Sequence, residues 1–141
     1  MKFEKSCGIV PLYFINNDPF VVLIQQNNGD IGFPKGHVEG NEAELETAYR
    51  ECKEETDLSP KIIEGFREEI SYYVPQYDVN KTIVFFVGVI DDLSYRRQES
   101  EIAKIILVPI DEAMKTLTYD QSRKVLEKAK EFYENNKKKF N

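Results

Sequence analysis

The segment from Gly36 to Leu58 has the sequence GHVEGNEAELETAYRECKEETDL and decides how the rest of the chain is interpreted. Its two bases, Arg50 and Lys53, stand against eight acids: Glu39, Glu42, Glu44, Glu46, Glu51, Glu54, Glu55 and Asp57. The whole chain carries a formal charge of −6, the same as this segment alone, so the remaining residues are neutral overall. Like charges four residues apart destabilise a helix by roughly 0.2–0.5 kcal/mol per pair. A fold does not need this arrangement, whereas a divalent metal site does.

The spacing of these residues predicts a helix with two distinct faces. At about 100° per residue, one stripe can pack on a core and contains Leu45, Ala48, Tyr49 and Cys52. An adjacent flank brings together the carboxylates of Glu44, Glu51 and Glu55, with Glu54 roughly 60° beyond Glu51. Several carboxylates can therefore converge on one point beside the helix.

Two further residues define how this helix starts and how its acids are held. Asn41 is the expected N-cap, and Glu44, three residues later, can complete a capping box. Arg50 is the single guanidinium among the acids, and a bidentate fork to Glu42 or Glu54 would hold the acidic array in register. We expect Arg50 to orient the acids rather than to take part in chemistry.

The same segment resembles the Nudix box. The family pattern is G, five residues, E, seven residues and REUxEExGU, with U apolar; here Gly36 and Glu42 are followed at these spacings by Arg50–Leu58, RECKEETDL. All charged positions are filled. Asp57 replaces the glycine, but Asp tolerates the left-handed conformation that such a position needs, and Cys52 occupies an apolar position. The alternative, a solvated acidic helix with ordinary intrahelical pairs, does not explain the full pattern, so we favour the box.

The resemblance implies an α/β fold, the Nudix α/β/α sandwich with a mixed β-sheet. It also implies a magnesium site, with Mn²⁺ as a possible substitute, whose members would be Gly36, Glu51, Glu54 and Glu55. Arg50 would belong to the catalytic constellation, and Glu51 or a later acid could act as the base. Glu101, in the short motif ESEI, precedes an expected strand at the place where relatives have an additional catalytic glutamate.

Length and composition limit the remaining possibilities. With 141 residues and 41% hydrophobic content, residues 1–141 are expected to form a single domain. The apolar start is interrupted by Glu4, Lys5 and Pro11, which fits neither a signal peptide nor a membrane span, so we expect a cytoplasmic protein. Cys7 and Cys52 suit buried thiols better than a disulfide framework or zinc site. The acidic balance argues against duplex nucleic acid as a partner, and a monomer or small homo-oligomer is expected.

Periodicity and turn residues predict the other elements. Expected strands are Cys7–Phe14, Phe20–Gln25, Gly65–Val74, Thr82–Ile90 and Ile102–Pro109, of which Thr82–Ile90 should be central because it is continuously apolar. The turn-rich residues Ile15 to Pro19 should join the first two strands. Expected helices are Asp111–Leu117 and Gln121–Asn135, the latter with an apolar face of Val125, Leu126, Ala129, Phe132 and Tyr133.

Residues outside the box bear on the substrate. The motif FPKGH at Phe33–His37 resembles the one that precedes the box in dinucleoside tetraphosphate hydrolases of the Nudix family. Lys35 and Lys81 can bind phosphates that a metal does not cover, and His37 can donate to a phosphate oxygen. Tyr72 and Tyr119 match positions where these relatives stack an adenine. Each residue also has an ordinary alternative. The two lysines could be surface residues, His37 could cap a turn, and the two tyrosines could pack against other side chains.

We therefore expect Mg²⁺-dependent hydrolysis of a phosphoanhydride bond, with diadenosine tetraphosphate converted to ATP and AMP by asymmetric attack of water. One alternative is a pyrophosphohydrolase of nucleoside triphosphates, such as oxidised ones, or of triphosphorylated RNA 5′ ends. An alternative of another class is a non-catalytic Nudix module that senses a nucleotide. An acidic interaction domain without a ligand is a third interpretation, and it predicts no stabilisation by Mg²⁺ and nucleotide together.

Overall fold

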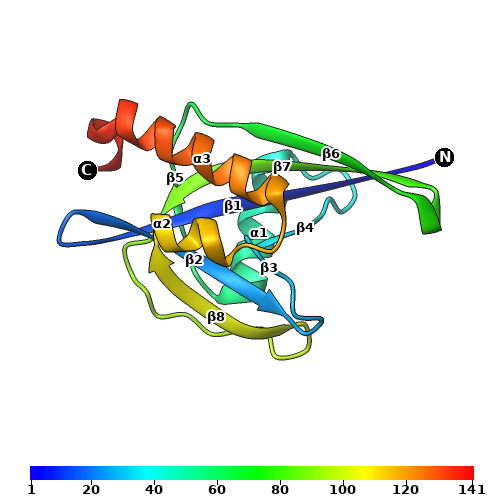
Figure 1. The fold of residues 1–141 in the computed structure, drawn as a ribbon, viewed down its shortest axis with the longest axis horizontal. Coiled ribbons are helices and arrows are strands. Elements are labelled where there is room, and N and C mark those ends of the chain that lie inside the picture. Colours follow the sequence, from blue (N-terminus) through cyan, green and yellow to red (C-terminus); the bar gives the residue numbers. More distant parts are fainter.

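The computed structural model describes residues 1–141, which form an eight-stranded mixed sheet flanked by helices (Figure 1). Its strands are β1 (Lys2–Ile15), β2 (Asp18–Gln26), β3 (Ile31–Gly32), β4 (Lys35–His37), β5 (Lys61–Ile62), β6 (Glu68–Val74), β7 (Val79–Val89) and β8 (Ile102–Pro109). Its helices are α1 (Glu44–Thr56), α2 (Ile110–Thr116) and α3 (Asp120–Asn135), with short 3₁₀ helices η1 (Pro75–Tyr77) and η2 (Lys137–Phe140). The α/β class with a mixed sheet is thus confirmed.

The centre of the sheet is the parallel pair of β1 and β7, which runs in register from Lys2 opposite Val79 to Leu12 opposite Val89. All other pairings are antiparallel. A strand that is covered on both faces has no polar alternation, which explains the continuous apolar run in β7. The prediction that this strand is central is confirmed.

Each face of the sheet has its own hydrophobic cluster, because successive side chains of a strand point to opposite faces. In β7, Ile83 and Phe85 belong to the cluster that contains residues of α2 and α3, whereas Val84 and Phe86 belong to the cluster with α1. Figure 1 shows α2 and α3 in front of the sheet and α1 behind it. The sheet therefore separates the acidic helix from the C-terminal helices.

The predicted strand boundaries differ from the structure where pairing or turns override the local pattern. The strand predicted from Cys7 extends back to Lys2 because β7 pairs with these polar residues as well. Between β1 and β2, Asn16 and Asn17 both have positive φ, as a two-residue hairpin turn requires. The strand predicted from Gly65 begins only at Glu68, since Gly65 has a φ of 106°. The prediction for β8 is confirmed at both ends.

The C-terminal helices lie within one residue of their predicted boundaries. On α3, the predicted face is confirmed, with Val125, Leu126 and Ala129 fully buried and Phe132 and Tyr133 half-buried. Both cysteines are buried free thiols, as predicted. None of the helices has the length and apolar composition needed to cross a membrane.

The start of α1 differs from the prediction. The N-cap is Ala43 rather than Asn41, and the backbone N–H of Ala43 donates to Glu46 instead of Glu44 at 3.1 Å. The backbone N–H of Glu42 donates to the Glu39 carbonyl at 3.1 Å, so the chain is still in a turn when it passes Asn41. The helix therefore begins later than a capping pattern alone indicates.

The predicted apolar stripe of α1 is only half correct. Ala48 and Cys52 are fully buried, but Leu45 and Tyr49 are 44% and 40% exposed. The buried face is rotated toward residues that the sequence pattern did not select: Thr47, Glu55 and Thr56. At the C-terminal end Asp57 has φ 61° and ψ 16°, which confirms that it replaces the glycine of the pattern in the left-handed conformation.

Candidate active site

The short strand β4 brings the backbone of the FPKGH motif against the middle of α1. The backbone N–H of Lys35 donates to Oε1 of Glu55 at 2.9 Å. At Gly36, which pairs with Cys7 of β1, a Cβ atom would overlap the carboxyl group of Glu51. Gly36 therefore allows the Glu51 carboxylate to lie directly on the β4 backbone, and the pairing of β4 with β1 fixes its place.

An open pocket of about 570 Å³ lies at this junction. It gathers six of the residues that the sequence predicted for the site: Lys35, Gly36, His37, Glu51, Glu55 and Glu101. It is also lined by polar residues that sequence reasoning missed, among them Ser6, Gln26, Asn27 and Asn28. The only available signal for Asn27 and Asn28 was their position in the turn-rich segment NNGD that follows the strand predicted at Phe20–Gln25, and loops often carry functional residues.

Among the carboxylates of this pocket, Glu55 is buried without a cationic side chain bound to it, Glu51 is half-buried and Glu101 is exposed. Glu55 is 4% exposed, and burial raises its pKa to about 8, with a further increase from the nearby charge of Glu51. Burial also raises the pKa of Glu51, against the opposing effect of Arg50. Lys35 has its pKa lowered by burial, although Glu55 acts in the opposite direction. A cation beside these carboxylates would offset the cost of their burial.

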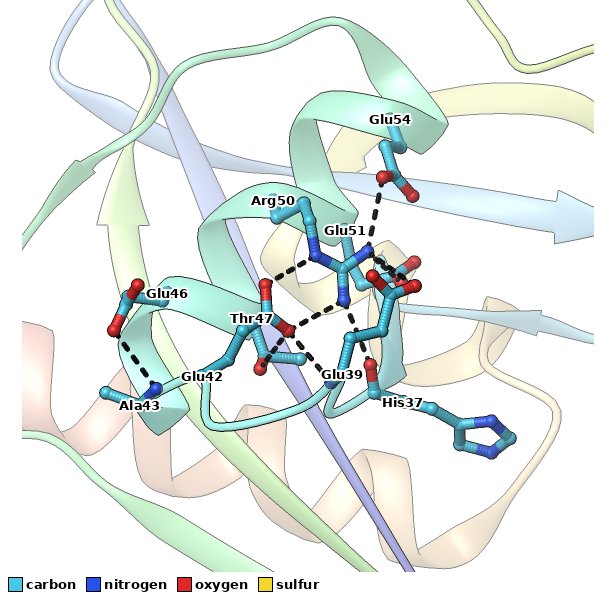
Figure 2. A network of polar contacts seen from close by, with 9 residues as sticks. All are labelled: His37, Glu39, Glu42, Ala43, Glu46, Thr47, Arg50, Glu51 and Glu54. Atoms are coloured by element: carbon cyan, nitrogen blue, oxygen red, sulfur yellow. Dashed lines mark hydrogen bonds and ion pairs between the residues drawn. The ribbon is translucent and has the colours of Figure 1, made fainter.

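Arg50 does not line the pocket, but it contacts several acids at once (Figure 2). It forms the predicted bidentate fork with Glu42, from Nε to Oε2 at 2.7 Å and from Nη2 to Oε1 at 3.0 Å. Its Nη1 donates to Glu51 at 2.8 Å and to Glu54 at 3.2 Å, and Nη2 donates to the His37 carbonyl at 3.0 Å. Arg50 thus holds Glu51 relative to both the preceding loop and β4, in agreement with a role in orientation.

Glu42 is the principal partner of this guanidinium. The hydrogen bonds from Arg50, together with those from the Glu39 backbone N–H and the Thr47 hydroxyl, lower the pKa of Glu42 to about 2. The carboxylate is therefore ionised throughout the neutral range. Its part in the site is to anchor Arg50.

Two acids of the segment lie elsewhere. Glu54 does not line the pocket; its carboxylate points to Arg50, and its side chain is 47% exposed. Its predicted role as a metal ligand is not tested by this arrangement. Glu44 was expected to converge with Glu51 and Glu55 on one point; this is wrong, because Glu44 does not line the pocket and instead pairs with Lys5 at 2.6 Å and Arg67 at 2.8 Å. The basic partners are supplied by β1 and by the loop before β6, which the helix pattern alone does not include.

The donor set fits a hard divalent cation. Glu51, Glu55 and Glu101 line the same pocket and offer only carboxylate oxygens, the ligands that Mg²⁺ prefers. No three acidic, histidine or cysteine side chains are close enough to form a complete metal site as they stand. The fit therefore depends on the carboxylate oxygens that these residues offer and on Gly36, which leaves room for the Glu51 carboxylate.

The remaining predicted residues form a second group on the face that carries α3. Tyr72 and Lys81 are directly opposite each other in β6 and β7, and both are half-buried. Tyr119, 56% exposed, stands just before α3, and a hydrogen bond from its hydroxyl to the Asp30 carboxylate raises its pKa. None of these three side chains lines the 570 Å³ pocket. Lys35 lies near both groups, because it lines the pocket and because the charge of Lys81 is among those that influence its pKa.

His37 has its backbone in the site and its ring at the surface. The ring is exposed and lies 3.5 Å from the Glu4 carboxylate, and Figure 2 shows it pointing away from Arg50. Its carbonyl accepts the hydrogen bond from Arg50. The backbone of His37 thus holds Arg50, while its ring lies beside Glu4 at the rim of the pocket.

Comparisons with known proteins agree with this geometry. A family model described as the NUDIX domain matches residues 6–129. The chain is 32% identical over 140 residues to the asymmetrical bis(5'-nucleosyl)-tetraphosphatase of Mus musculus, covering 91% of this chain and 94% of that protein. It is also 32% identical to the Sus scrofa protein of the same name, over 79% of this chain and 78% of the relative.

Among solved structures, the fold is similar to that of a C. elegans Ap4A hydrolase in a binary complex. The TM-score is 0.86 at 22% sequence identity, and the match covers 94% of this chain and 98% of the other. At this identity the likeness establishes the arrangement of the sheet and helices.

Proposed function

This chain belongs to the NUDIX family of hydrolases, and on that premise we propose that it hydrolyses dinucleoside polyphosphates with Mg²⁺. Diadenosine tetraphosphate is the proposed substrate, with ATP and AMP as products. The similarity to the Mus musculus and Sus scrofa asymmetrical bis(5'-nucleosyl)-tetraphosphatases supports this choice.

The observation that carries the proposal is the meeting of Glu51, Glu55 and Glu101 with Lys35 in one open pocket. Carboxylates alone would repel a phosphate chain. A divalent cation held by them would reverse the local charge, and Lys35 would bind a phosphate oxygen beyond the cation. The site would then accept several consecutive phosphates rather than one.

Glu51, Glu55 and Glu101 would hold Mg²⁺, which when bound neutralises phosphate charge and lowers the pKa of a water molecule. Gly36 leaves room for the Glu51 carboxylate, and Arg50 keeps that carboxylate from turning away. The Lys35 backbone N–H holds Glu55. Glu54 remains a predicted further ligand, because its exposed side chain is bound only to Arg50.

The second group of residues would bind the nucleoside. Lys81 lies on the same sheet face as Tyr72 and continues the positive charge from Lys35. Tyr72 and the exposed ring of Tyr119 would offer aromatic faces to an adenine, with stacking worth about 1–3 kcal/mol per base. This arrangement would place one adenosine on the α3 face and the phosphate chain over the carboxylates.

The proposal is tested by incubating the protein and Mg²⁺ separately with diadenosine tetraphosphate, nucleoside triphosphates, ADP-ribose and a triphosphorylated RNA oligomer. Products are separated by anion-exchange chromatography. ATP plus AMP from the dinucleotide, at a rate well above those for the other substrates, is the expected result. Cleavage of another substrate with the dinucleotide intact would refute the assignment of Lys35, His37, Lys81 and the two tyrosines.

The same assay separates the other class of function. Tight nucleotide binding without turnover over a wide range of Mg²⁺ and Mn²⁺ would identify a nucleotide-sensing module and refute the proposed catalysis. A Glu55→Gln protein is the matched control, since it should lose the turnover of the wild type while retaining the sheet and helices.

A further inference from the structure

The turn from Asn27 to Ile31 lies between the two groups of the site. It follows β2 at a point where the register with β8 shifts between Gln25 and Gln26. A shift of this kind bends a strand and redirects the residues that follow it. Figure 1 shows β2 ending beside the start of β8, so the redirected turn begins next to Glu101.

The first residue of the turn holds the Glu101 segment by two hydrogen bonds. The backbone N–H of Asn27 donates to the Glu101 carbonyl at 3.0 Å, and its side-chain amide donates to the Ser100 carbonyl at 3.0 Å. Asn27 alone therefore holds the carbonyls of two consecutive residues, Ser100 and Glu101. Because the Glu101 side chain is exposed and has no hydrogen bond of its own, its position depends on the backbone that Asn27 holds.

The last residues of the turn hold the segment before α3. The Ile31 N–H donates to the Thr118 hydroxyl at 2.7 Å, and the Thr118 N–H donates back to the Ile31 carbonyl at 3.1 Å. Next to this pair, the Tyr119 hydroxyl donates to Oδ2 of Asp30 at 2.7 Å. Both the backbone and the ring of this segment are thus attached to the turn.

Internal hydrogen bonds make the turn a stiff connector. The Gln26 N–H donates to the Asp30 carbonyl at 2.8 Å, and the Asp30 N–H donates to the Asn28 side chain at 2.9 Å. Gly29, with a φ of 97°, supplies the conformation that closes the turn. The two ends of the turn therefore cannot move independently without breaking these bonds.

We propose that Asn27 and Asp30 are positioning residues, which through this turn set Glu101 and the Tyr119 ring at a fixed separation. The inference rests on the proposed function, because it takes Glu101 as a group that acts at the phosphates and Tyr119 as one that stacks on the base. The turn would then fix the distance between the group that acts on the reacting phosphate and the ring that stacks on the bound adenosine. Asn27 and Asp30 would position Glu101 and Tyr119 without contacting the phosphate or the adenosine themselves.

The Asn27 end is tested by a double-mutant cycle with Asn27→Ala and Glu101→Gln, measuring kcat for diadenosine tetraphosphate. Asn27→Ala alone is expected to lower kcat about tenfold, as loss of an outer-shell partner does. In the Glu101→Gln background it should change kcat by less than about twofold, because the residue acts through Glu101. An equal loss in both backgrounds, or no loss in the wild type, overturns the proposal. Asn135→Ala, exposed on α3, is the matched control.

The hydrogen bond between Asp30 and Tyr119 is tested by calorimetric AMP affinity in Asp30→Ala, Tyr119→Phe and the double variant. Each single change should weaken AMP binding about three- to tenfold, the loss of one hydrogen bond, and the double variant should equal Tyr119→Phe alone. Additive losses, no loss, or no AMP binding by the wild type overturns the proposal. Asp18→Ala, exposed at the start of β2, is the control.

These measurements separate the failure of this inference from that of the proposed function. AMP has no phosphoanhydride bond, so its affinity tests Asp30 and Tyr119 even if diadenosine tetraphosphate is not hydrolysed. Absence of turnover by the wild type refutes the proposed function together with the role of Asn27 toward Glu101, whereas additive AMP losses with normal turnover refute only the role of Asp30 toward Tyr119. Thermal unfolding of every variant is recorded, and an unchanged midpoint excludes loss of the fold as the cause.

Discussion

The two ends of α1 carry carboxylates in opposite electrostatic situations. Toward its N-terminus, Glu44 is held by Arg67 and Lys5, and just before the helix Glu42 is held by Arg50, so the pKa of each is lowered to about 2. Farther along, burial raises the pKa of Glu51 and takes that of Glu55 to about 8. One continuous acidic sequence thus contains paired carboxylates and buried carboxylates whose charge is only partly compensated.

This difference separates acids that are paired with bases and stabilise the fold from the acids to which the proposed function assigns a cation. A carboxylate with a lowered pKa contributes stability at neutral pH, whereas one with a raised pKa costs stability there unless a cation binds. Such buried, perturbed groups in a pocket are typical of functional sites. The following changes test the distinction from the largest expected effect to the smallest.

Glu55→Gln should have the largest effect on activity, a loss of more than about 100-fold, since even outer-shell changes at metal sites cost 10–100-fold. The measurement is the initial rate of ATP and AMP release at saturating Mg²⁺. Retention of the wild-type rate would show that Glu55 belongs with the structural acids.

The same variant has a predicted pH signature in the metal-free protein. Because the pKa of Glu55 is raised from 4.5 to about 8, the folded state binds more protons than the unfolded state between these values. Stability contributed by the neutral acid is therefore complete below about pH 4.5 and is lost as the pH rises toward 8. Urea unfolding in a chelator should show this decline in the wild type and a smaller decline in Glu55→Gln.

Arg50→Lys should lower both stability and activity. Lysine keeps the charge but cannot form the fork to Glu42 while also donating to Glu51, so the free energy of unfolding should fall by about 1.5–3 kcal/mol. Arg67→Lys breaks a comparable fork to Glu44, away from the pocket, and is the control. Equal loss of activity in the two folded variants would contradict the division of the acids.

Glu54→Gln should have an intermediate effect. Its exposed carboxylate is bound to Arg50 in the structure, and its predicted ligand role requires it to reach a cation. We expect an activity loss of about tenfold with a higher Mg²⁺ requirement, measured by titrating Mg²⁺ in the rate assay. If the Mg²⁺ requirement stays the same, Glu54 is a partner of Arg50 only; Glu46→Gln, on the exposed side of α1, is the control.

Glu44→Gln should have the smallest effect, a loss of about 0.5–1 kcal/mol of stability at neutral pH with normal activity. Because its pKa is lowered from 4.5 to about 2, the contribution is complete above pH 4.5 and is lost as the pH falls toward 2. Urea unfolding at pH 7 and at low pH measures this. A variant as stable as the wild type at pH 7 would show that the pairs with Lys5 and Arg67 contribute nothing.

Prediction from the sequence succeeded where a local pattern was sufficient. The spacing of the box placed Arg50 on Glu42, and Asp57 in a left-handed cap, because these contacts lie within one helix and its adjoining loops. It failed at Asn41 and Glu44. At Asn41 the chain is still in the turn that joins Glu39 to Glu42, and Glu44 is held by partners from β1 and the loop before β6, which the helix period cannot show.

The sequence by itself determined the α/β class, the central apolar strand, the acidic helix and six of the 13 residues that line the pocket. Only the tertiary structure decided which acids are buried and which are paired, because that depends on what packs against each face of α1. It also brought Glu101 and Tyr119 to opposite ends of the turn that contains Asn27 and Asp30. Those residues are far apart in the chain, and only the pairing of β2 with β8 and with β3 places them together.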